Sequence, residues 1–236
     1  MRQETNCVLR KSGRAMQEHT DGTAVPVAHE AELPQPGSFV TVDVAGAPLL
    51  VVRQDDGSIA VLSNVCRHRG ARVELQPSGR RKMFSCPYHR WCYGRDGGIR
   101  SMPFDDGFIG VDRVDRSLLH RASTVRHGIV WTTTEPGTEL DLDTDALAAL
   151  DSTTLLHTSR TQLDHTLDDA RATLPDGTSV NGLHITDSGS HLEVRTLWAS
   201  GLRGETSELA LWILVPAGAP ATDHDAAEAR WRSLTA

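Results

Sequence analysis

The 236-residue chain has few cysteines, four in all, and few aromatic side chains, 5% of its residues. Four cysteines are too few for a disulfide scaffold of this length, so we treat them as candidates for metal or redox chemistry. No stretch reaches the roughly 18 uncharged apolar residues of a membrane helix, and the first residues lack the apolar core of a secretion signal. These absences predict a cytoplasmic globular protein with no membrane contact.

Charge is unevenly distributed along the chain. The formal net charge of −7 argues against nucleic-acid binding. Between Cys66 and Arg100, however, there are nine basic residues and two acidic ones. Such a basic cluster indicates either a solvated surface or a docking face for an acidic electron donor, and the sequence leaves both open. Reversing Arg80 and Arg81 to Glu would test the docking interpretation.

The sequence predicts three segments that differ in composition and in the periodicity of their apolar residues. Residues 1–34 are polar and aperiodic, typical of a loosely packed arm. Residues 35–137 alternate β-branched and apolar side chains between turn signals at 45–47, 55–57, 77–79 and 96–98, which predicts an antiparallel β-meander. Residues 138–236 predict a smaller α+β unit. Its expected elements are a short helix at 144–151, paired strands at 191–199 and 207–217, and a helix at 226–234.

Two short segments each carry one cysteine and one histidine. Cys66-Arg67-His68 is followed after seventeen residues by Cys86-Pro87-Tyr88-His89. A Rieske-type [2Fe–2S] centre uses this donor set, because two cysteines hold one iron and two histidines hold the other. A structural zinc site is the alternative, but zinc sites usually pair their ligands as C-x₂₋₄-C and H-x₃₋₅-H. The mixed spacing therefore favours an iron–sulfur centre.

Residues 64–103, NVCRHRGARVELQPSGRRKMFSCPYHRWCYGRDGGIRSMP, resemble the Rieske domain of the Rieske non-haem iron ring-hydroxylating oxygenases. Residues 36–64 are similar to the strands that precede the cluster in that family, and residues 127–136 to its exit strand. The resemblance implies that Cys66 and Cys86 bind one iron and that His68 and His89 bind the other. The family usually has glycine after the second histidine, where this chain has Arg90.

Several neighbouring residues receive less specific interpretations. The bc-complex type of Rieske protein has a disulfide whose positions correspond to Ala71 and Tyr88 here, so we expect the lower-potential oxygenase or ferredoxin type. We interpret Tyr88 and Trp91 as packing around the second loop rather than as an electron relay. Cys7 and Cys92 receive no role.

The resemblance also implies a mononuclear iron in the second domain, held by two histidines and a carboxylate. Residues 155–174 stand where the histidine-bearing segment is expected, but they lack its pattern. Regular helix or strand geometry would separate His157 from His165, and His184 from His191, too far for one ion without a sharp turn. The possible carboxylates are Asp164, Asp168, Asp169 and Asp187. We assign no mononuclear iron ligand and consider such an iron unlikely in this chain.

The predicted fold is an all-β Rieske domain followed by a reduced α+β domain resembling the oxygenase catalytic fold, to whose late sheet residues 191–220 are similar. The predicted function is a [2Fe–2S] component that passes single electrons, through His68 and His89, to a mononuclear iron on a partner subunit. Its partners would be a ferredoxin or reductase donor and a full-length oxygenase subunit in a hetero-oligomer. Two alternatives stay open, and with them the question of whether the chain is itself an enzyme. One is a complete compact oxygenase with atypical iron ligands, and the other is a non-catalytic stabilising subunit.

Overall fold

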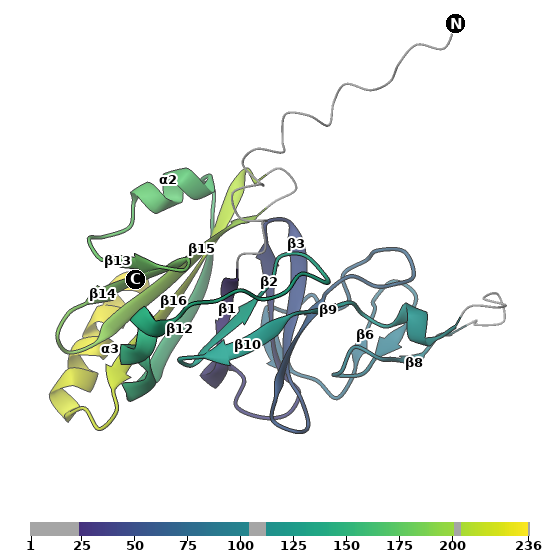
Figure 1. The fold of residues 1–236 in the computed structure, drawn as a ribbon, viewed down its shortest axis with the longest axis horizontal. Coiled ribbons are helices and arrows are strands. Elements are labelled where there is room, and N and C mark those ends of the chain that lie inside the picture. Colours follow the sequence, from purple (N-terminus) through teal and green to yellow (C-terminus); the bar gives the residue numbers. More distant parts are fainter. Residues whose placement is uncertain (1–23, 104–111, 201–203, 236) are drawn as a thin grey trace, which may run out of the picture.

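The computed structural model describes residues 24–103, 112–200 and 204–235, which form four antiparallel sheets with few helices (Figure 1). The elements of the first half are β1 (Val25–His29), η1 (Glu30–Glu32), β2 (Ser38–Val44), β3 (Ala47–Arg53), β4 (Ile59–Ser63), β5 (Ser78–Arg80), β6 (Phe84–Ser85), β7 (Cys92–Tyr93), β8 (Ile99–Ser101), η3 (Val114–Arg116), β9 (His120–Arg121), β10 (Ser123–Arg126) and β11 (Ile129–Thr132). Those of the second half are η4 (Asp145–Ser152), β12 (Thr153–Leu163), α2 (Leu167–Ala172), β13 (Thr178–Val180), β14 (Leu183–Asp187), β15 (Leu192–Ser200), β16 (Thr206–Pro216) and α3 (Ala221–Thr235).

The first half contains the predicted β-meander. Strands β2, β3 and β4 pair in sequence order inside a five-stranded sheet of order β5-β2-β3-β4-β9. The turn signal at 45–47 lies at the β2–β3 junction, where Ala45 and Gly46 both have positive φ. The turn predicted at 77–79 is wrong in part, because Ser78 and Gly79 belong to β5 and pair with β2. Local turn residues do not reveal such a distant strand partner.

Two three-stranded sheets complete the first half. The sheet β6-β7-β8 is built from very short strands, and the β6–β7 hairpin carries the loop that contains Cys86 and His89. The sheet β1-β11-β10 lies nearer the second half (Figure 1).

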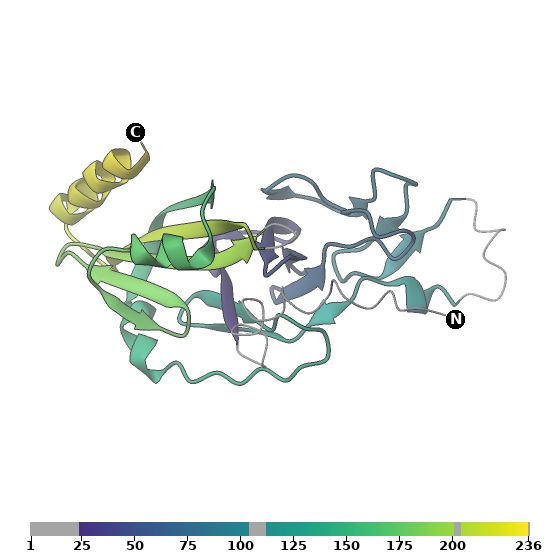
Figure 2. The ribbon, with the colours of Figure 1, turned by 90° about the horizontal axis from the view of Figure 1, so that it is seen from above.

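The second half is one five-stranded sheet of order β12-β16-β15-β14-β13 with two α-helices. The predicted pairing of residues 191–199 with 207–217 is confirmed by β15 and β16, and the predicted helix at 226–234 lies within α3. The segment predicted as a short helix forms the 3₁₀ helix η4, with Thr144 as its N-cap residue. Helix α3 stands at the end of the molecule farthest from β6 and β8 (Figures 1 and 2).

The two halves share one hydrophobic core, to which β1 is central. All five residues of β1 are buried, and its side chains pack with those of β2 and of the second-half sheet. The indole N–H of Trp198 donates to the Pro26 carbonyl at 2.9 Å, and that of Trp212 donates to Glu32 Oε1 at 2.8 Å. The loosely packed arm predicted through residue 34 is therefore wrong for residues 25–33, while residues 1–23 lie outside the described part.

Candidate metal centre

Two loops of the first half share one backbone hydrogen-bond pattern. The amide of Cys66 donates to the Ala71 carbonyl, and the amide of Cys86 donates to the Trp91 carbonyl, each at 2.8 Å. The amides of Gly70 and Arg90 donate back to the carbonyls of Cys66 and Cys86, each at 3.0 Å. Both loops thus close a tight turn around a cysteine, which fixes the residues that follow it.

Gly70 and Arg90 occupy the same position in these two turns, four residues after the cysteine. Gly70 has φ +78° and Arg90 has φ +61°, so both lie in the left-handed region. Glycine adopts this region readily, whereas a side chain with a Cβ is strained there. The bulky residue that the sequence placed after His89 is therefore accommodated by a left-handed backbone.

Both cysteines lie in an apolar environment. Cys66 is 3% exposed, Cys86 is 1% exposed, and both thiols are free. They belong to the cluster of buried side chains that includes Phe84, Trp91 and Tyr93. Burial raises the pKa of the Cys66 thiol, because the uncharged form is favoured away from water. A bound metal would supply the positive charge that stabilises the thiolates here.

The hydroxyl of Tyr93 contacts the first loop at two points. Its oxygen accepts the Arg67 amide proton at 3.0 Å and lies 3.2 Å from Cys66 Sγ. When Cys66 is a thiol either atom can be the donor, but a thiolate, the form that binds a metal, can only accept, and the Tyr93 hydroxyl is then the donor. Burial raises the pKa of Tyr93, so this hydroxyl stays protonated and acts as a donor.

The two imidazoles meet beside the thiols. The rings of His68 and His89 are 4.5 Å apart between centroids, with their planes at 71°. The indole of Trp91, which is 1% exposed, stacks on His68 at 4.8 Å. Tyr88, which is 63% exposed, lies 3.9 Å from the His89 ring. Trp91 is thus buried, but it packs on the imidazole of the first loop rather than around the second, and most of Tyr88 is open to solvent.

The four predicted ligands suit a mixed-ligand [2Fe–2S] cluster. Two free buried thiols and two adjacent imidazoles match the set in which two cysteines hold one iron and two histidines hold the other. Across the described ranges, no three His, Cys, Asp or Glu side chains converge as they would around one ion. Two thiols and two imidazoles are the donor set that holds two irons with two protein ligands each.

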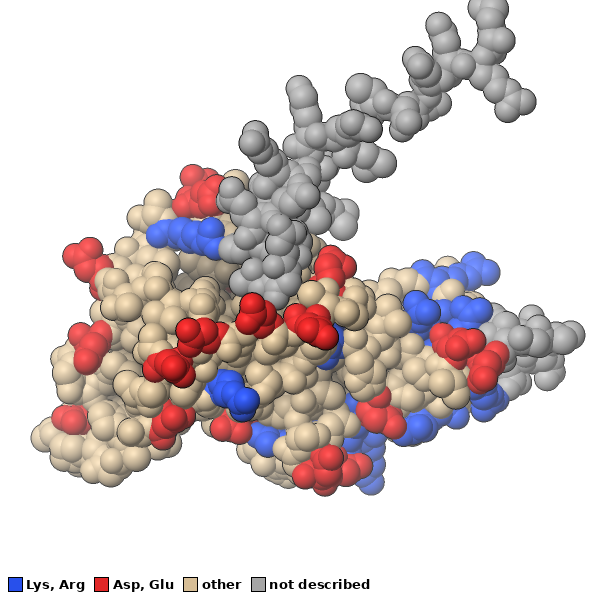
Figure 3. Space-filling view, in the orientation of Figure 1, with Lys and Arg blue, Asp and Glu red and all other residues tan. Residues whose placement is uncertain are grey.

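The basic cluster of residues 66–100 is partly neutralised within the fold, which the sequence did not reveal. Four of its arginines form ion pairs, namely Arg72 with Asp43, Arg81 with Glu74, Arg95 with Asp55 and Arg100 with Asp96. Among the described residues, the other five basic residues of this cluster form no ion pair, and three of them, Arg67, Arg69 and Arg90, flank His68 and His89 in sequence, whereas Arg80 and Lys82 do not. Lys and Arg side chains gather over the end that carries β6 and β8, with acidic residues between them (Figure 3). Part of the charge that the fold does not neutralise is therefore found in the two cysteine–histidine loops, and the rest is on Arg80 and Lys82.

Cys92 lies just outside the second loop, with its sulfur 3.5 Å from Ser85 Oγ and 3.4 Å from the Arg90 carbonyl oxygen. These are ordinary polar contacts and give it no part in the ligand set. Cys7 lies outside the described residues.

The histidines of the second half make separate contacts. His157 on β12 stacks on Trp231 at 4.8 Å and lies 2.6 Å from Glu228, which connects β12 to α3. His165 is exposed beyond the other end of β12. His191 lies near Ser188 and Ser190, with its Nδ1 within 3.0 Å of both hydroxyls. The four carboxylates considered with them, Asp164, Asp168, Asp169 and Asp187, are exposed.

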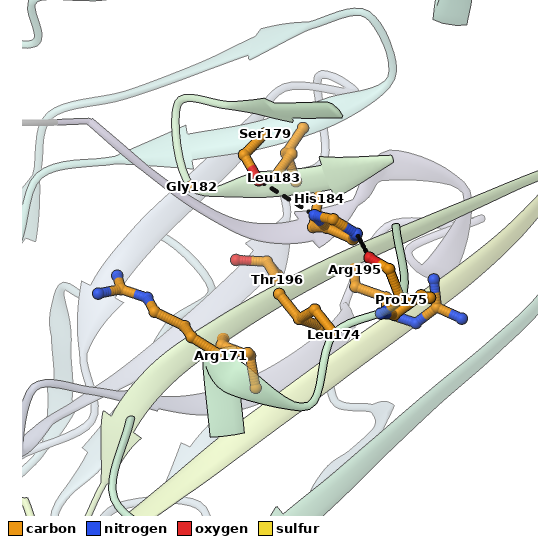
Figure 4. A pocket seen from close by; sticks show the side chains of 10 residues that line it. Arg171, Leu174, Pro175, Ser179, Gly182, Leu183, His184, Arg195 and Thr196 are labelled. Atoms are coloured by element: carbon orange, nitrogen blue, oxygen red, sulfur yellow. Dashed lines mark hydrogen bonds between the residues drawn. The ribbon is translucent and has the colours of Figure 1, made fainter. Parts of the chain in front are cut away.

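His184 lies in the wall of a cavity of about 420 Å³ between α2 and the β13–β14 hairpin (Figure 4). Its Nε2 is 2.8 Å from the Pro175 carbonyl oxygen, and its Nδ1 is 3.0 Å from Ser179 Oγ. The carbonyl can only accept, so Nε2 carries the proton and Nδ1 accepts the serine hydroxyl. Both ring nitrogens are therefore used within the chain.

No helix in ranges 24–103, 112–200 and 204–235 combines the length and the apolar character needed to span a membrane.

Comparison with known proteins identifies the first half and agrees with the fold. Residues 23–113 match the family model of the Rieske [2Fe-2S] domain. The chlorobenzene dioxygenase subunit alpha of Cupriavidus sp. (strain PS12) is 35% identical over 147 residues, and the biphenyl 2,3-dioxygenase subunit alpha of Rhodococcus jostii (strain RHA1) is 33% identical over 147 residues. Both matches cover 62% of this chain and 30% of the relative, so the matched segment spans less than a third of these relatives.

Solved structures match over both halves of the chain. A quaternary ammonium Rieske monooxygenase has a TM-score of 0.68 at 17% identity, covering 92% of this chain and 76% of its own. A naphthalene 1,2-dioxygenase from Rhodococcus sp., bound to indole, has a TM-score of 0.65 at 17% identity, covering 89% and 72%. At these identities the likeness concerns the fold, and it confirms the predicted fold class.

Proposed function

Because residues 23–113 are a Rieske [2Fe-2S] domain and the chain is homologous to ring-hydroxylating dioxygenase alpha subunits, we propose that it is an electron-transfer component of a non-haem iron oxygenase system. Cys66, Cys86, His68 and His89 would hold the cluster. When bound, a [2Fe–2S] cluster accepts and releases one electron at a time. The observation that carries the proposal is the matched pair of turns, which brings two buried thiols and two adjacent imidazoles together.

The residues around the ligands have separable tasks in this proposal. Tyr93 donates a hydrogen bond to Cys66 and stabilises negative charge on the sulfur. Trp91 closes one face of His68 and excludes water from it. The imidazole side is half-buried and bordered by the exposed Tyr88 ring, so a partner protein can approach it closely.

We place the accepting mononuclear iron on a partner subunit, which would be a full-length oxygenase subunit. The contacts of the second-half histidines support this placement. His157 connects β12 to α3, and both ring nitrogens of His184 are bonded within the chain. These side chains stabilise the second half rather than face a common centre.

Metal and sulfide analysis of anaerobically purified protein tests the proposal. We expect about two irons and two sulfides per chain. About three irons would favour a complete oxygenase, and substrate-dependent oxygen uptake would then establish it. Colourless protein holding one zinc ion would overturn the proposal.

Ligand variants make the same test specific. Cys86→Ser and His89→Asn should lose the visible absorption and the iron, whereas Cys92→Ser and Cys7→Ser should keep both. Reconstitution with an oxygenase partner separates electron transfer from subunit stabilisation. If the chain only stabilises its partner, His89→Asn leaves partner activity intact, and if it transfers electrons, activity is lost.

A further inference from the structure

Arg90 holds a strained conformation without an internal contact that explains it. Its φ of +61° is left-handed, at the position where the first loop has Gly70. The hydrogen bond that closes the turn uses the Arg90 amide, which any residue except proline provides. Among the described residues, the Arg90 guanidinium forms no salt bridge and no hydrogen bond. Glycine would make the same turn with less strain, so the strain at this position accompanies an exposed arginine side chain.

The position of Arg90 shows what it can reach. It directly follows His89 and is exposed, next to the largely exposed ring of Tyr88. The two ligand loops, residues 66–71 and 86–91, contain arginines and no acidic residue. Arg72, Arg81, Arg95 and Arg100 are paired with carboxylates. Of the five basic residues in 66–100 that form no ion pair with the described residues, three lie in the ligand loops, namely Arg67, Arg69 and Arg90, and the other two are Arg80 and Lys82.

We propose that Arg90 is the docking residue for an acidic electron-donor protein, and that its guanidinium binds a carboxylate on that donor's surface. This inference rests on the proposed function. Arginine suits this role, because its planar guanidinium group binds a carboxylate through two parallel hydrogen bonds. A charged, exposed border is typical of a transient encounter, whereas permanent subunit interfaces are more apolar. Each encounter oxidises the donor by one electron and reduces the cluster by one electron, and no bond forms or breaks.

Three variants distinguish the effect of the Arg90 charge on the reduction rate from the effect of left-handed backbone strain on stability. Arg90→Gly removes both, Arg90→Lys keeps the charge and the strain, and Ala45→Gly relieves the left-handed strain at φ +50° in the distant β2–β3 turn. Stopped-flow absorbance would follow cluster reduction by an acidic plant-type ferredoxin, whose potential is lower than that of Rieske centres. Thermal unfolding would report stability.

We expect Arg90→Gly to raise Tm by about 2–4 °C and to slow reduction about five- to tenfold at low salt. The rates should converge at high salt, where surface charge is screened. Arg90→Lys keeps the charge but loses the paired hydrogen bonds, so it should give a rate between those of the wild type and Arg90→Gly, without the gain in Tm. Ala45→Gly should gain stability and keep the wild-type rate.

The opposite results would overturn the docking role. They are a wild-type rate for Arg90→Gly at low salt, a lower rate for Arg90→Lys than for Arg90→Gly, or loss of iron from Arg90→Gly. Reduction by methyl viologen radical cation, which needs no carboxylate contact, should be the same in all variants. A wild-type chain that binds no iron and sulfide would instead refute the proposed function itself.

Discussion

The imidazole of His68 lies almost parallel to the indole of Trp91, with 13° between the planes and 4.8 Å between the centroids. His89 meets the same imidazole edge-on at 4.5 Å. The His68 ring is therefore held between two aromatic groups, one buried and one half-buried. Such packing fixes a ring orientation that a free side chain would not keep.

Replacing Trp91 should change the cluster potential as well as stability. Trp91→Leu removes the electron-rich indole face and admits water, and both changes stabilise the added negative charge of the reduced cluster. We expect the midpoint potential to rise on the order of 40 mV, equivalent to about 1 kcal/mol for one electron. Trp91→Phe keeps a stacked ring, so its midpoint potential should rise less than that of Trp91→Leu. Protein-film voltammetry would measure the series.

Trp212→Phe is the matched control for that series. Trp212 is fully buried in the core shared by the two halves and is not a neighbour of the ligand loops. The Trp212→Phe protein should be less stable than the wild type but should keep the wild-type midpoint potential. A Trp91→Leu protein with intact iron content and an unchanged potential would show that Trp91 only fills space.

Removing the Tyr93 hydroxyl should shift the potential in the opposite direction. The hydrogen bond from this hydroxyl to Cys66 withdraws electron density from the sulfur and favours the reduced cluster. We expect Tyr93→Phe to lower the potential by about 40–60 mV, equivalent to roughly 1–1.4 kcal/mol. Voltammetry measures the shift, and an unchanged or raised potential would contradict the assigned donor role.

Glu32 should be a major determinant of stability. Its buried carboxylate accepts from the His29 amide and the Trp212 indole, both at 2.8 Å, and pairs with Arg160 at 3.3 Å. Glu32→Ala leaves the Arg160 charge without this partner, so we expect a loss of about 3–5 kcal/mol in the free energy of unfolding. Urea denaturation measures the loss. The neighbouring Glu30→Ala should change stability far less.

His29 should make stability depend on pH. Burial lowers the pKa of this histidine, although Glu32 and Glu30 act in the opposite sense, so the folded state holds it neutral. The unfolded state titrates near pH 6.5 and binds more protons below that pH. Stability should therefore fall as the pH drops below about 6.5 and should be constant, for this group, above it.

His29→Asn isolates that contribution. Asn is a good N-cap and can replace the ring nitrogen that accepts the Ala31 amide at 3.1 Å. The free energy of unfolding, measured from pH 5 to 7.5, should fall less steeply with acid in the variant. If the free energy of unfolding depends on pH in the same way in the wild type and the variant, His29 does not contribute to the pH dependence of stability.

Local patterns in the sequence were sufficient to predict much of the fold of the first half. The meander of β2, β3 and β4 follows from alternation and turn residues, because neighbouring strands pair in chain order. The ligand residues follow from the mixed Cys and His spacing, since few metal groups use that set. Their assignment as ligands stays a prediction until metal is measured.

Features that depend on distant partners were not predictable from local patterns. Residues 25–28 are a short apolar run at the end of a polar, aperiodic segment, too short to identify a strand, yet β1 is buried because β11 and the second-half sheet cover it. Arg81 looks like a free surface charge in sequence, yet it pairs with Glu74. The proposed reversal of Arg80 and Arg81 would therefore break a partly buried ion pair, which makes Arg90 the better test of docking.

The shared core built around β1 has a mechanical consequence. Because β1 is hydrogen-bonded to β11 on one side and packed on the second-half sheet on the other, the two halves move as one piece. The imidazoles of His68 and His89 therefore cannot move between two partners by a rotation of the first half relative to the second. Under the proposed function, the donor and the acceptor would therefore each have to contact an edge that keeps one position relative to the second half.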